Sequence, residues 1–146
     1  MLILAAPTTS SWQAIVLFVV LFVGMMAVSS LVGGWHRLGQ RYATKRDVPY
    51  LNLSGTTVRV GLSHYRRSVT VGADEDGLYL SAVFVLRPFH PPLLIPWAAL
   101  RARTREADWS YFGKSFDRME VGPDRVVVRI ESIVMDGFSR YLPPLT

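Results

Sequence analysis

The chain has 146 residues, half of them hydrophobic, and a formal net charge of +5 at pH 7. This length accommodates one domain of ordinary size and an additional segment. The positive charge does not indicate a nucleic-acid-binding protein, because such proteins need a basic stripe on the folded domain. Here four basic residues lie within 37–46, and the other Lys and Arg residues nearly balance the 11 acidic ones. The lack of cysteine is compatible with a reducing compartment.

The first feature along the chain is an uncharged apolar run at residues 14–32. No Asp, Glu, Lys, Arg or His occurs in or before it, and it contains nothing more polar than two serines. As a helix this run would be roughly 28 Å long, close to the ~30 Å hydrocarbon thickness of a bilayer. Trp12 and Trp35 flank it, and indoles prefer the level of the lipid headgroups. The run therefore predicts a transmembrane helix.

A cleaved signal peptide is the alternative to a transmembrane helix. Such a peptide needs a basic n-region, an apolar core of about 7–15 residues and a cleavage site with small residues. Ala27-Val28-Ser29 matches a cleavage site of this kind. However, no basic residue precedes the apolar run, and the run is too long. The pattern favours a retained membrane anchor.

The charges on the two sides of the run predict its orientation. Basic side chains follow it without an acidic residue among them, whereas none precedes it. Lys and Arg in short loops stay on the cytoplasmic side of the inner membrane. The predicted organisation is a short extracytoplasmic N-terminus at 1–13, a transmembrane helix at 14–34, a basic juxtamembrane helix at 35–46 and a cytoplasmic β domain at 47–146.

The juxtamembrane segment has helical spacing. Trp35, Leu38 and Tyr42 recur at intervals of three and four, and basic residues recur every four. A helix that passes through anionic headgroups has this pattern. If Gly33-Gly34 ends the first helix, the same residues would instead form a loop. The predicted membrane-interface residues are Trp12, Trp35, Arg37, Arg41, Tyr42, Lys45 and Arg46.

After Asp47-Val48-Pro49 the periodicity changes from helical to two, which is typical of strands. Alternating segments include TTVRVGL and SVTVGA, and the run LYLSAVFVL at 78–86 predicts a further strand. Asp76-Gly77 and Gly122-Pro123-Asp124 predict hairpin turns. Apolar residues within 131–142 have helical spacing, although Gly137 weakens that helix. We predict about seven short antiparallel strands followed by a C-terminal helix.

The stretch RPFHPPLLIPW at 87–97 contains four of the nine prolines. Proline lacks the backbone donor that a sheet needs and restricts the residue before it. The stretch therefore predicts a stiff corner between two strands, with Pro96 on an edge strand, at a strand end or in a bulge. A docking site for a protein partner is the alternative role, and its candidate residues are Phe89, His90 and Trp97.

The sequence contains no recognisable catalytic or metal-binding set. None of the three histidines lies three or four residues from another candidate ligand in a helical segment, so a zinc site has no support. Gly113-Lys114-Ser115 matches the end of a phosphate-binding loop, but Asp108 occupies the position where that motif requires a glycine. We predict a protein that is not an enzyme and has no cofactor.

Three arginines alternate along one predicted strand, at Arg101, Arg103 and Arg105. They could bind an anion. The favoured interpretation is a solvated strand face whose arginines pair with opposite charges on a neighbouring strand, such as Asp117 or Glu120.

The segments DGLYLS and LLIPWAALR, within seven predicted strands and a final helix, resemble bacterial pleckstrin-homology-like (PH-like) and GRAM-like domains over residues 55–142. HPPLLIPW, together with Gly34-Trp35 and Tyr42, also resembles a group of bacterial membrane proteins. In lipid-binding members of the PH family, basic residues near the first-to-second strand loop hold phosphoinositide headgroups. The resemblance implies this anion- or lipid-binding role for Arg59, Arg66 and Arg67. Here the arginines are adjacent rather than alternating, and the family's lysine is missing.

These observations predict a non-catalytic accessory or scaffold subunit. Its single helix and PH-like domain would contact membrane lipids and protein partners in a larger membrane complex, with no nucleic acid and no small-molecule substrate. The first alternative is a lipid- or ligand-sensing domain that uses Arg59, Arg66 and Arg67. The second is an enzyme with its site near His64 or His90.

Overall fold

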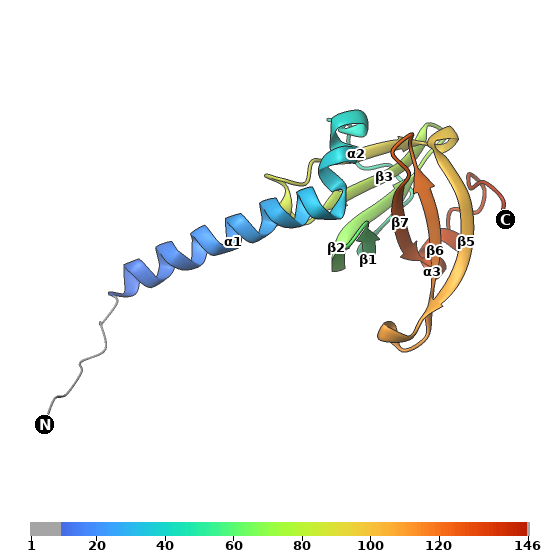
Figure 1. Ribbon diagram of the computed structural model, residues 1–146. Coiled ribbons are helices and arrows are strands. Elements are labelled where there is room, and N and C mark those ends of the chain that lie inside the picture. Colours follow the sequence, from blue (N-terminus) through green and yellow to red (C-terminus); the bar gives the residue numbers. More distant parts are fainter. Residues whose placement is uncertain (1–9, 146) are drawn as a thin grey trace, which may run out of the picture.

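A computed structural model describes residues 10–145 and contains a long N-terminal helix followed by a curled antiparallel sheet (Figure 1). The predicted N-terminal apolar helix, seven antiparallel strands and C-terminal helix are confirmed. The helices are α1 (Ser11–Gly33), α2 (Trp35–Tyr42) and α3 (Ser132–Asp136). The strands are β1 (Asn52–Val60), β2 (Ser63–Ala73), β3 (Gly77–Ala82), β4 (Leu93–Pro96), β5 (Leu100–Asp108), β6 (Lys114–Val121) and β7 (Val126–Glu131). Three short 3₁₀ turns are η1 (Phe84–Leu86), η2 (Trp97–Ala99) and η3 (Trp109–Tyr111).

Helix α1 is apolar on all sides and is long enough to cross a membrane. It ends where Gly34 adopts a left-handed conformation with φ of +94°, which glycine adopts at little cost. Helix α2 then leaves in a different direction (Figure 1). The helix expected at 35–46 is therefore present over a shorter range, and a break separates it from α1. The expected N-terminal segment 1–13 lies mostly outside the described residues.

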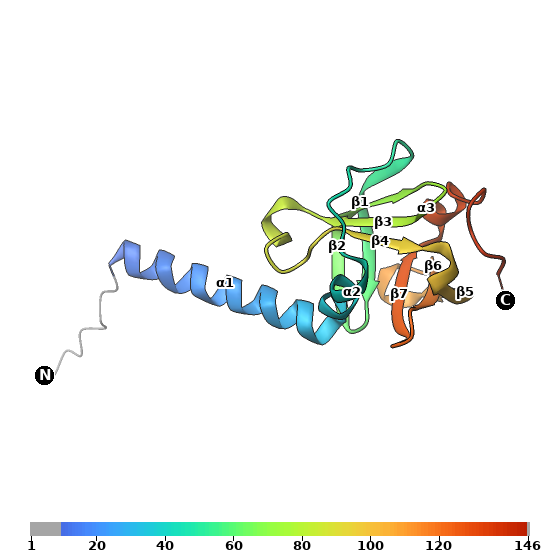
Figure 2. The same ribbon diagram turned by 90° about the horizontal axis from the view of Figure 1, so that it is seen from above.

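The strands follow the order β4-β3-β2-β1-β7-β6-β5. Two meanders, β1 to β4 and β5 to β7, join through antiparallel pairing of β1 with β7. Strands β4 and β5 stand at opposite ends of this order, yet only η2 separates them in the chain. The sheet must therefore curl so that its two edges approach each other (Figure 2). Its inner face forms the hydrophobic core.

The core also includes residues that precede the expected domain boundary at 47. Trp35 and Leu38 on α2 are buried in the same cluster as the inward-facing strand residues. Ala43, directly after α2, forms a β-bridge with Leu93 of β4. Helix α2 is therefore packed into the folded domain.

The proline-rich corner begins earlier than the sequence predicts. The sequence predicts a strand over 78–86, but β3 ends at Ala82. Residues 83–86 instead turn away from the sheet through η1. Segment 83–92, hereafter the corner, projects beside α1 (Figure 2). Pro96 ends β4, which is an edge strand, as proline's missing donor requires.

The C-terminal helix is shorter than the predicted segment 131–142. It ends at Asp136, directly before Gly137, and turns follow it. Val134, Met135 and Phe138 are buried and attach this end of the chain to the core.

Candidate functional site at the helix–domain junction

The C-terminal part of α1 packs directly against the domain. Met26, Ser30 and Gly33 are its buried residues, whereas most of the helix is exposed. Ser63 on β2 donates its hydroxyl proton to the backbone carbonyl of Ser29 over 2.7 Å. The hydroxyl of Ser30 donates to the carbonyl of Phe89 over 2.7 Å. The helix is thus bonded both to the sheet and to the proline-rich corner, without an intervening linker.

Gly33 permits the closest approach at this junction. A Cβ atom on Gly33 would overlap the hydroxyl of Ser63 and would lie 3.0 Å from the carbonyl oxygen of Val60. The side chain of any other residue would therefore force α1 away from β2.

An aromatic cluster lies behind the junction and consists of Trp35, Tyr65 and His90. The three rings contact one another edge to face, with centroids 5.2 to 5.4 Å apart, and all three residues are buried. Such pairs contribute about 0.5–1.5 kcal/mol each beyond the burial of their area. The indole of Trp35 also donates a hydrogen bond to the carbonyl of Pro91 over 3.0 Å. The cluster connects α2, β2 and the corner.

His90 uses both ring nitrogens inside this cluster. Its Nδ1 lies 2.9 Å from the carbonyl oxygen of Leu86, and its Nε2 lies 2.9 Å from the hydroxyl of Tyr65. Burial lowers the pKa of His90, although the hydrogen bond to Leu86 acts in the opposite direction. The neutral ring therefore donates from Nδ1 to Leu86 and accepts at Nε2 from Tyr65, whose own pKa is raised by burial.

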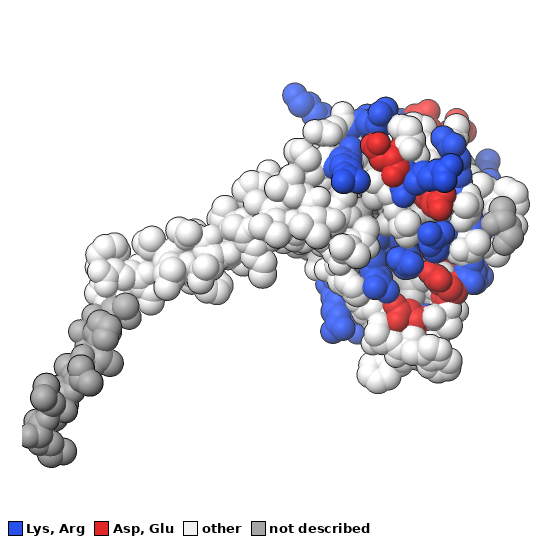
Figure 3. Space-filling view, viewed as in Figure 1, with Lys and Arg blue, Asp and Glu red and all other residues white. Residues whose placement is uncertain are grey.

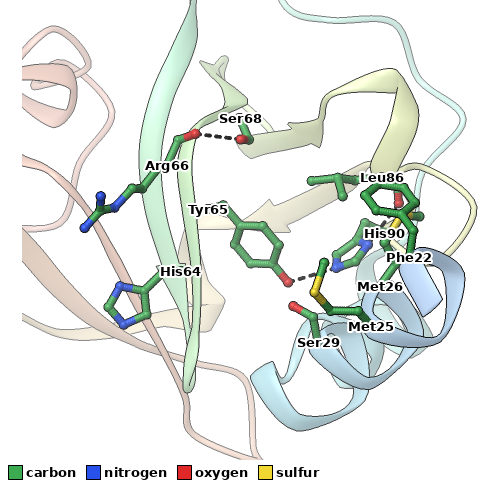
Figure 4. A pocket seen from close by; sticks show the side chains of 10 residues that line it. All are labelled: Phe22, Met25, Met26, Ser29, His64, Tyr65, Arg66, Ser68, Leu86 and His90. Atoms are coloured by element: carbon green, nitrogen blue, oxygen red, sulfur yellow. Dashed lines mark hydrogen bonds between the residues drawn. The ribbon is translucent and has the colours of Figure 1, made fainter. Parts of the chain in front are cut away.

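A cavity of about 480 Å³ lies between α1 and β2 (Figure 4). Phe22, Met25 and Met26 line it from the helix, and Leu86 lines it from the corner. In Figure 4 the side chain of Arg66 points away from these apolar groups. Within residues 10–145 no group of three or more His, Cys, Asp or Glu side chains could hold a metal ion. The cavity suits an apolar occupant better than a polar substrate.

The expected membrane-interface residues have different environments. Trp12 is 63% exposed near the start of α1, and Arg37 and Lys45 are also exposed. Trp35 is completely buried, so its expected place at the headgroups is wrong; the break at Gly34 turns it into the core. Three further residues contact the domain: Tyr42 lies half-buried near Gly122, Arg41 faces Asp124 at 3.9 Å, and Arg46 pairs with Asp76 at 2.7 Å.

The three candidate docking residues do not form one exposed surface. His90 is expected to be exposed on the corner, and this prediction is wrong because the residue is fully buried. Its two hydrogen bonds hold the ring inside the domain. The indole of Trp97 donates to the carbonyl of Asp74 over 2.8 Å and stacks on Tyr141. Phe89 is half-buried against α1.

The three candidate anion-binding arginines lie on β1 and β2. Arg59 forms an ion pair with Asp108 at 2.6 Å. Arg66 and Arg67 are exposed, but they belong to β2 itself rather than to the first-to-second strand loop. The guanidinium of Arg66 lies over the ring of Tyr111, 5.1 Å from its centroid. Of the three, Arg66 and Arg67 remain accessible to a ligand.

Two of the three arginines of β5 share one buried carboxylate. Both Arg103 and Arg105 bond to Asp117 on β6, at 2.7 and 2.9 Å, so Asp117 is confirmed as a cross-strand partner. The expected solvated face is wrong here, because Asp117 and Arg103 are buried. Ser132 donates to the same carboxylate over 2.6 Å. Burial alone would raise the pKa of Asp117, but these hydrogen bonds keep it below its ordinary value. The network is structural because its carboxylate is fully buried.

Sequence reasoning missed two exposed apolar groups. Val83, Phe84 and Val85 are exposed at the outer end of the corner. Trp109 and Phe112 are exposed at the tip of the β5–β6 hairpin. A signal for the first group was present, because the run from 82 to 86 is continuously apolar and lacks the alternation of a half-buried strand.

Neither the family models nor the curated proteins nor the solved structures compared with this chain give a match. The functional argument therefore depends on the geometry of the chain itself.

Proposed function

We propose that this chain is a single-pass membrane protein whose domain acts as a non-catalytic accessory or scaffold subunit on the cytoplasmic side of the inner membrane. The observation that carries the proposal is the junction between α1 and the domain. Hydrogen bonds from Ser30 and Ser63, together with the buried Gly33, join the helix to the sheet without a linker. A domain attached in this way has a fixed orientation relative to its helix, which suits a protein that positions a partner.

The exposure of α1 supports a place in the bilayer. Its apolar side chains are exposed over most of its length. Figure 3 shows that the helix carries no charged side chains and that the charged side chains lie over the domain. Water would penalise that surface, whereas lipid would not. Cleavage after Ser29 would also remove the contacts that Met26 and Ser29 make with the domain. This supports a retained anchor rather than a signal peptide.

The charge distribution supports a cytoplasmic domain. The basic side chains that follow α1 include Arg37 and Lys45, which are exposed. Exposed basic residues next to a membrane helix favour the cytoplasmic leaflet. We keep the PH-like assignment within this proposal. A curled sheet of seven strands followed by a helix has the same order of elements as a PH-like domain.

The test is purification of the full-length tagged chain from native membranes in a mild detergent. The chain should resist extraction by alkaline carbonate and should bring down a stoichiometric partner that mass spectrometry identifies. Fusions of a fluorescent protein and of alkaline phosphatase to the C-terminus should report a cytoplasmic end. A monodisperse monomer without any partner would overturn the scaffold role.

The second candidate function is recognition of anionic lipid by the domain. The observation that favours it is the exposed guanidinium of Arg66, which makes no ion pair within residues 10–145. Full-length protein in detergent should then bind anionic vesicles, and the double change Arg66→Ala and Arg67→Ala should weaken that binding. Arg101→Ala is the matched control, because Arg101 is exposed on another strand. Equal binding by all three proteins would exclude this function.

A further inference from the structure

The corner between β3 and β4 lies beside the C-terminal half of α1. The hydroxyl of Ser30 bonds to the carbonyl of Phe89, and one cavity is lined jointly by Leu86 and the helix residue Phe22. Another is lined jointly by Phe89 and Leu31. The corner therefore runs alongside residues 22–31 of the helix, and Figure 2 shows it projecting along α1 toward the helix's N-terminal end.

The outer end of the corner is apolar and unpartnered. Phe84 is 79% exposed, and Val83 and Val85 are also exposed. Arg87 is the one charged residue of segment 83–89. Its Nε lies 3.4 Å from the carbonyl of Ala82, and its flexible stem can carry the charge toward the headgroups. An exposed apolar cluster of this kind is unfavourable in water. It adjoins the apolar surface of α1, so the environment that covers the helix can also cover the cluster.

Most backbone amides of the corner donate to a backbone carbonyl, either within the corner or on β2. The amide of Val83 donates to the carbonyl of Ser68 over 2.8 Å, and the amide of Leu86 donates to the carbonyl of Val83 over 2.9 Å. The amides of Arg87 and Phe89 donate to carbonyls within the same turn. Pairing of this kind lowers the cost of placing non-helical backbone at membrane depth.

We propose that residues 83–89 insert into the cytoplasmic leaflet beside α1, with Phe84 and its neighbouring valines in contact with phospholipid acyl chains. This inference rests on the proposed function, because it requires α1 to span the bilayer. The domain is bonded to α1, so a single span alone still leaves helix and domain free to tilt together in the bilayer. A second membrane contact, held in place by the buried His90, fixes which face of the domain points into the cytoplasm.

The experiment uses the absence of cysteine from the chain. Single-cysteine variants of the full-length protein are labelled with an environment-sensitive fluorophore and reconstituted into phosphatidylcholine–phosphatidylglycerol vesicles. Phe84→Cys tests the corner. Ile133→Cys is its matched control, because these two residues are 79% and 80% exposed and α3 lies on the side of the domain away from α1 (Figures 1 and 2). Leu21→Cys, on the exposed surface of α1, tests the span itself.

We expect spin-labelled lipids to quench the labels at 84 and 21 several-fold more strongly than the label at 133. Aqueous iodide should show the opposite order. Iodide quenching at 84 equal to that at 133, with the label at 21 still quenched by lipid, would overturn the insertion and leave the span intact. Protection at 84 from both quenchers would also overturn it, because a protein would then cover the corner.

A label at 21 that lipid does not quench would instead refute the proposed membrane span. The variant Val85→Cys repeats the corner measurement if Phe84→Cys does not give folded protein. Its side chain is also exposed at the outer end of the corner, so the same quenching order is expected.

Discussion

The hydroxyl of Tyr65 lies 2.9 Å from Nε2 of His90, and this pair connects the centre of the sheet to the proline-rich corner. Tyr65 comes from β2, and His90 comes from the segment between β3 and β4. Because the pair is buried beside Trp35, it stabilises the corner from inside the domain. Its properties lead to the first prediction, which concerns pH.

Acidification should destabilise the domain through His90. Burial lowers the pKa of His90 below its ordinary value of 6.5, so the unfolded state takes up its proton first as the pH falls. The stability that the neutral ring of His90 gives to the folded domain is fully present above pH 6.5. It is lost as the pH decreases through the lower pKa that His90 has in the folded state. Urea unfolding in detergent micelles, followed by tryptophan fluorescence from neutral to mildly acidic pH, measures this loss.

The variant His90→Gln should show a flatter dependence on pH across the same interval, whatever its stability at neutral pH. His64→Gln is the second comparison, because burial and the charge of Arg59 also lower the pKa of His64. If wild-type protein and His90→Gln lose stability in parallel, His90 is not the titrating group.

Gly33→Ala should separate α1 from the domain. The added methyl group would overlap the hydroxyl of Ser63 and crowd the carbonyl of Val60, so the helix must move. Overpacking of this kind costs about 1–3 kcal/mol. The matched control is Gly24→Ala in the same helix, where no atom lies within 4 Å of the new Cβ. Limited proteolysis should cut the Gly33→Ala variant near the junction, and equal resistance of the two variants would contradict the packing.

Asp117→Asn should strongly destabilise the domain. The carboxylate is fully buried, and the variant would remove the negative charge that pairs with the buried guanidinium of Arg103. Removal of one partner from a buried pair costs about 3–5 kcal/mol. Asp136→Asn removes an exposed partner of Arg105 and should cost less than about 1 kcal/mol. Urea unfolding of both variants measures the difference, and similar losses would show that burial does not govern the network.

Trp35→Ala should destabilise the domain although the residue directly follows the membrane-length helix. Its ring is completely buried against Tyr65 and His90, and large-to-small changes of a buried tryptophan cost about 3–5 kcal/mol. Trp12→Ala, at an exposed position near the other end of α1, should change the free energy of unfolding by less than about 0.5 kcal/mol. An unfolding transition unchanged by Trp35→Ala would place this side chain outside the core.

Local sequence patterns predicted the elements but not all of their ends. The apolar run predicted α1, and period-two alternation predicted the strands, because both signals depend on neighbouring residues only. The apolar run at 78–86 predicts that residues 83–86 continue the strand. They leave the sheet instead, since β3 pairs with β2 only as far as Ala82.

The three arginines of β5 illustrate the same limit. Simple alternation places Arg101, Arg103 and Arg105 on one face. A bulge at Ala102, with φ of +51°, interrupts the pairing between β5 and β6, and Arg103 is buried while Arg101 is exposed. The choice of Asp117 as a partner was foreseeable from charge, but its complete burial was not.

The sequence by itself determined an uncharged helix of membrane length, a basic segment after it and a proline-rich corner, because composition and short-range periodicity encode these features. Tertiary structure alone decided that Trp35 and His90 are buried together and that Phe84 is exposed beside α1. Those outcomes depend on the turn at Gly34 and on the curl of the sheet, which bring together residues more than fifty positions apart in the chain. No local pattern contains that information, because burial is a property of the assembled core.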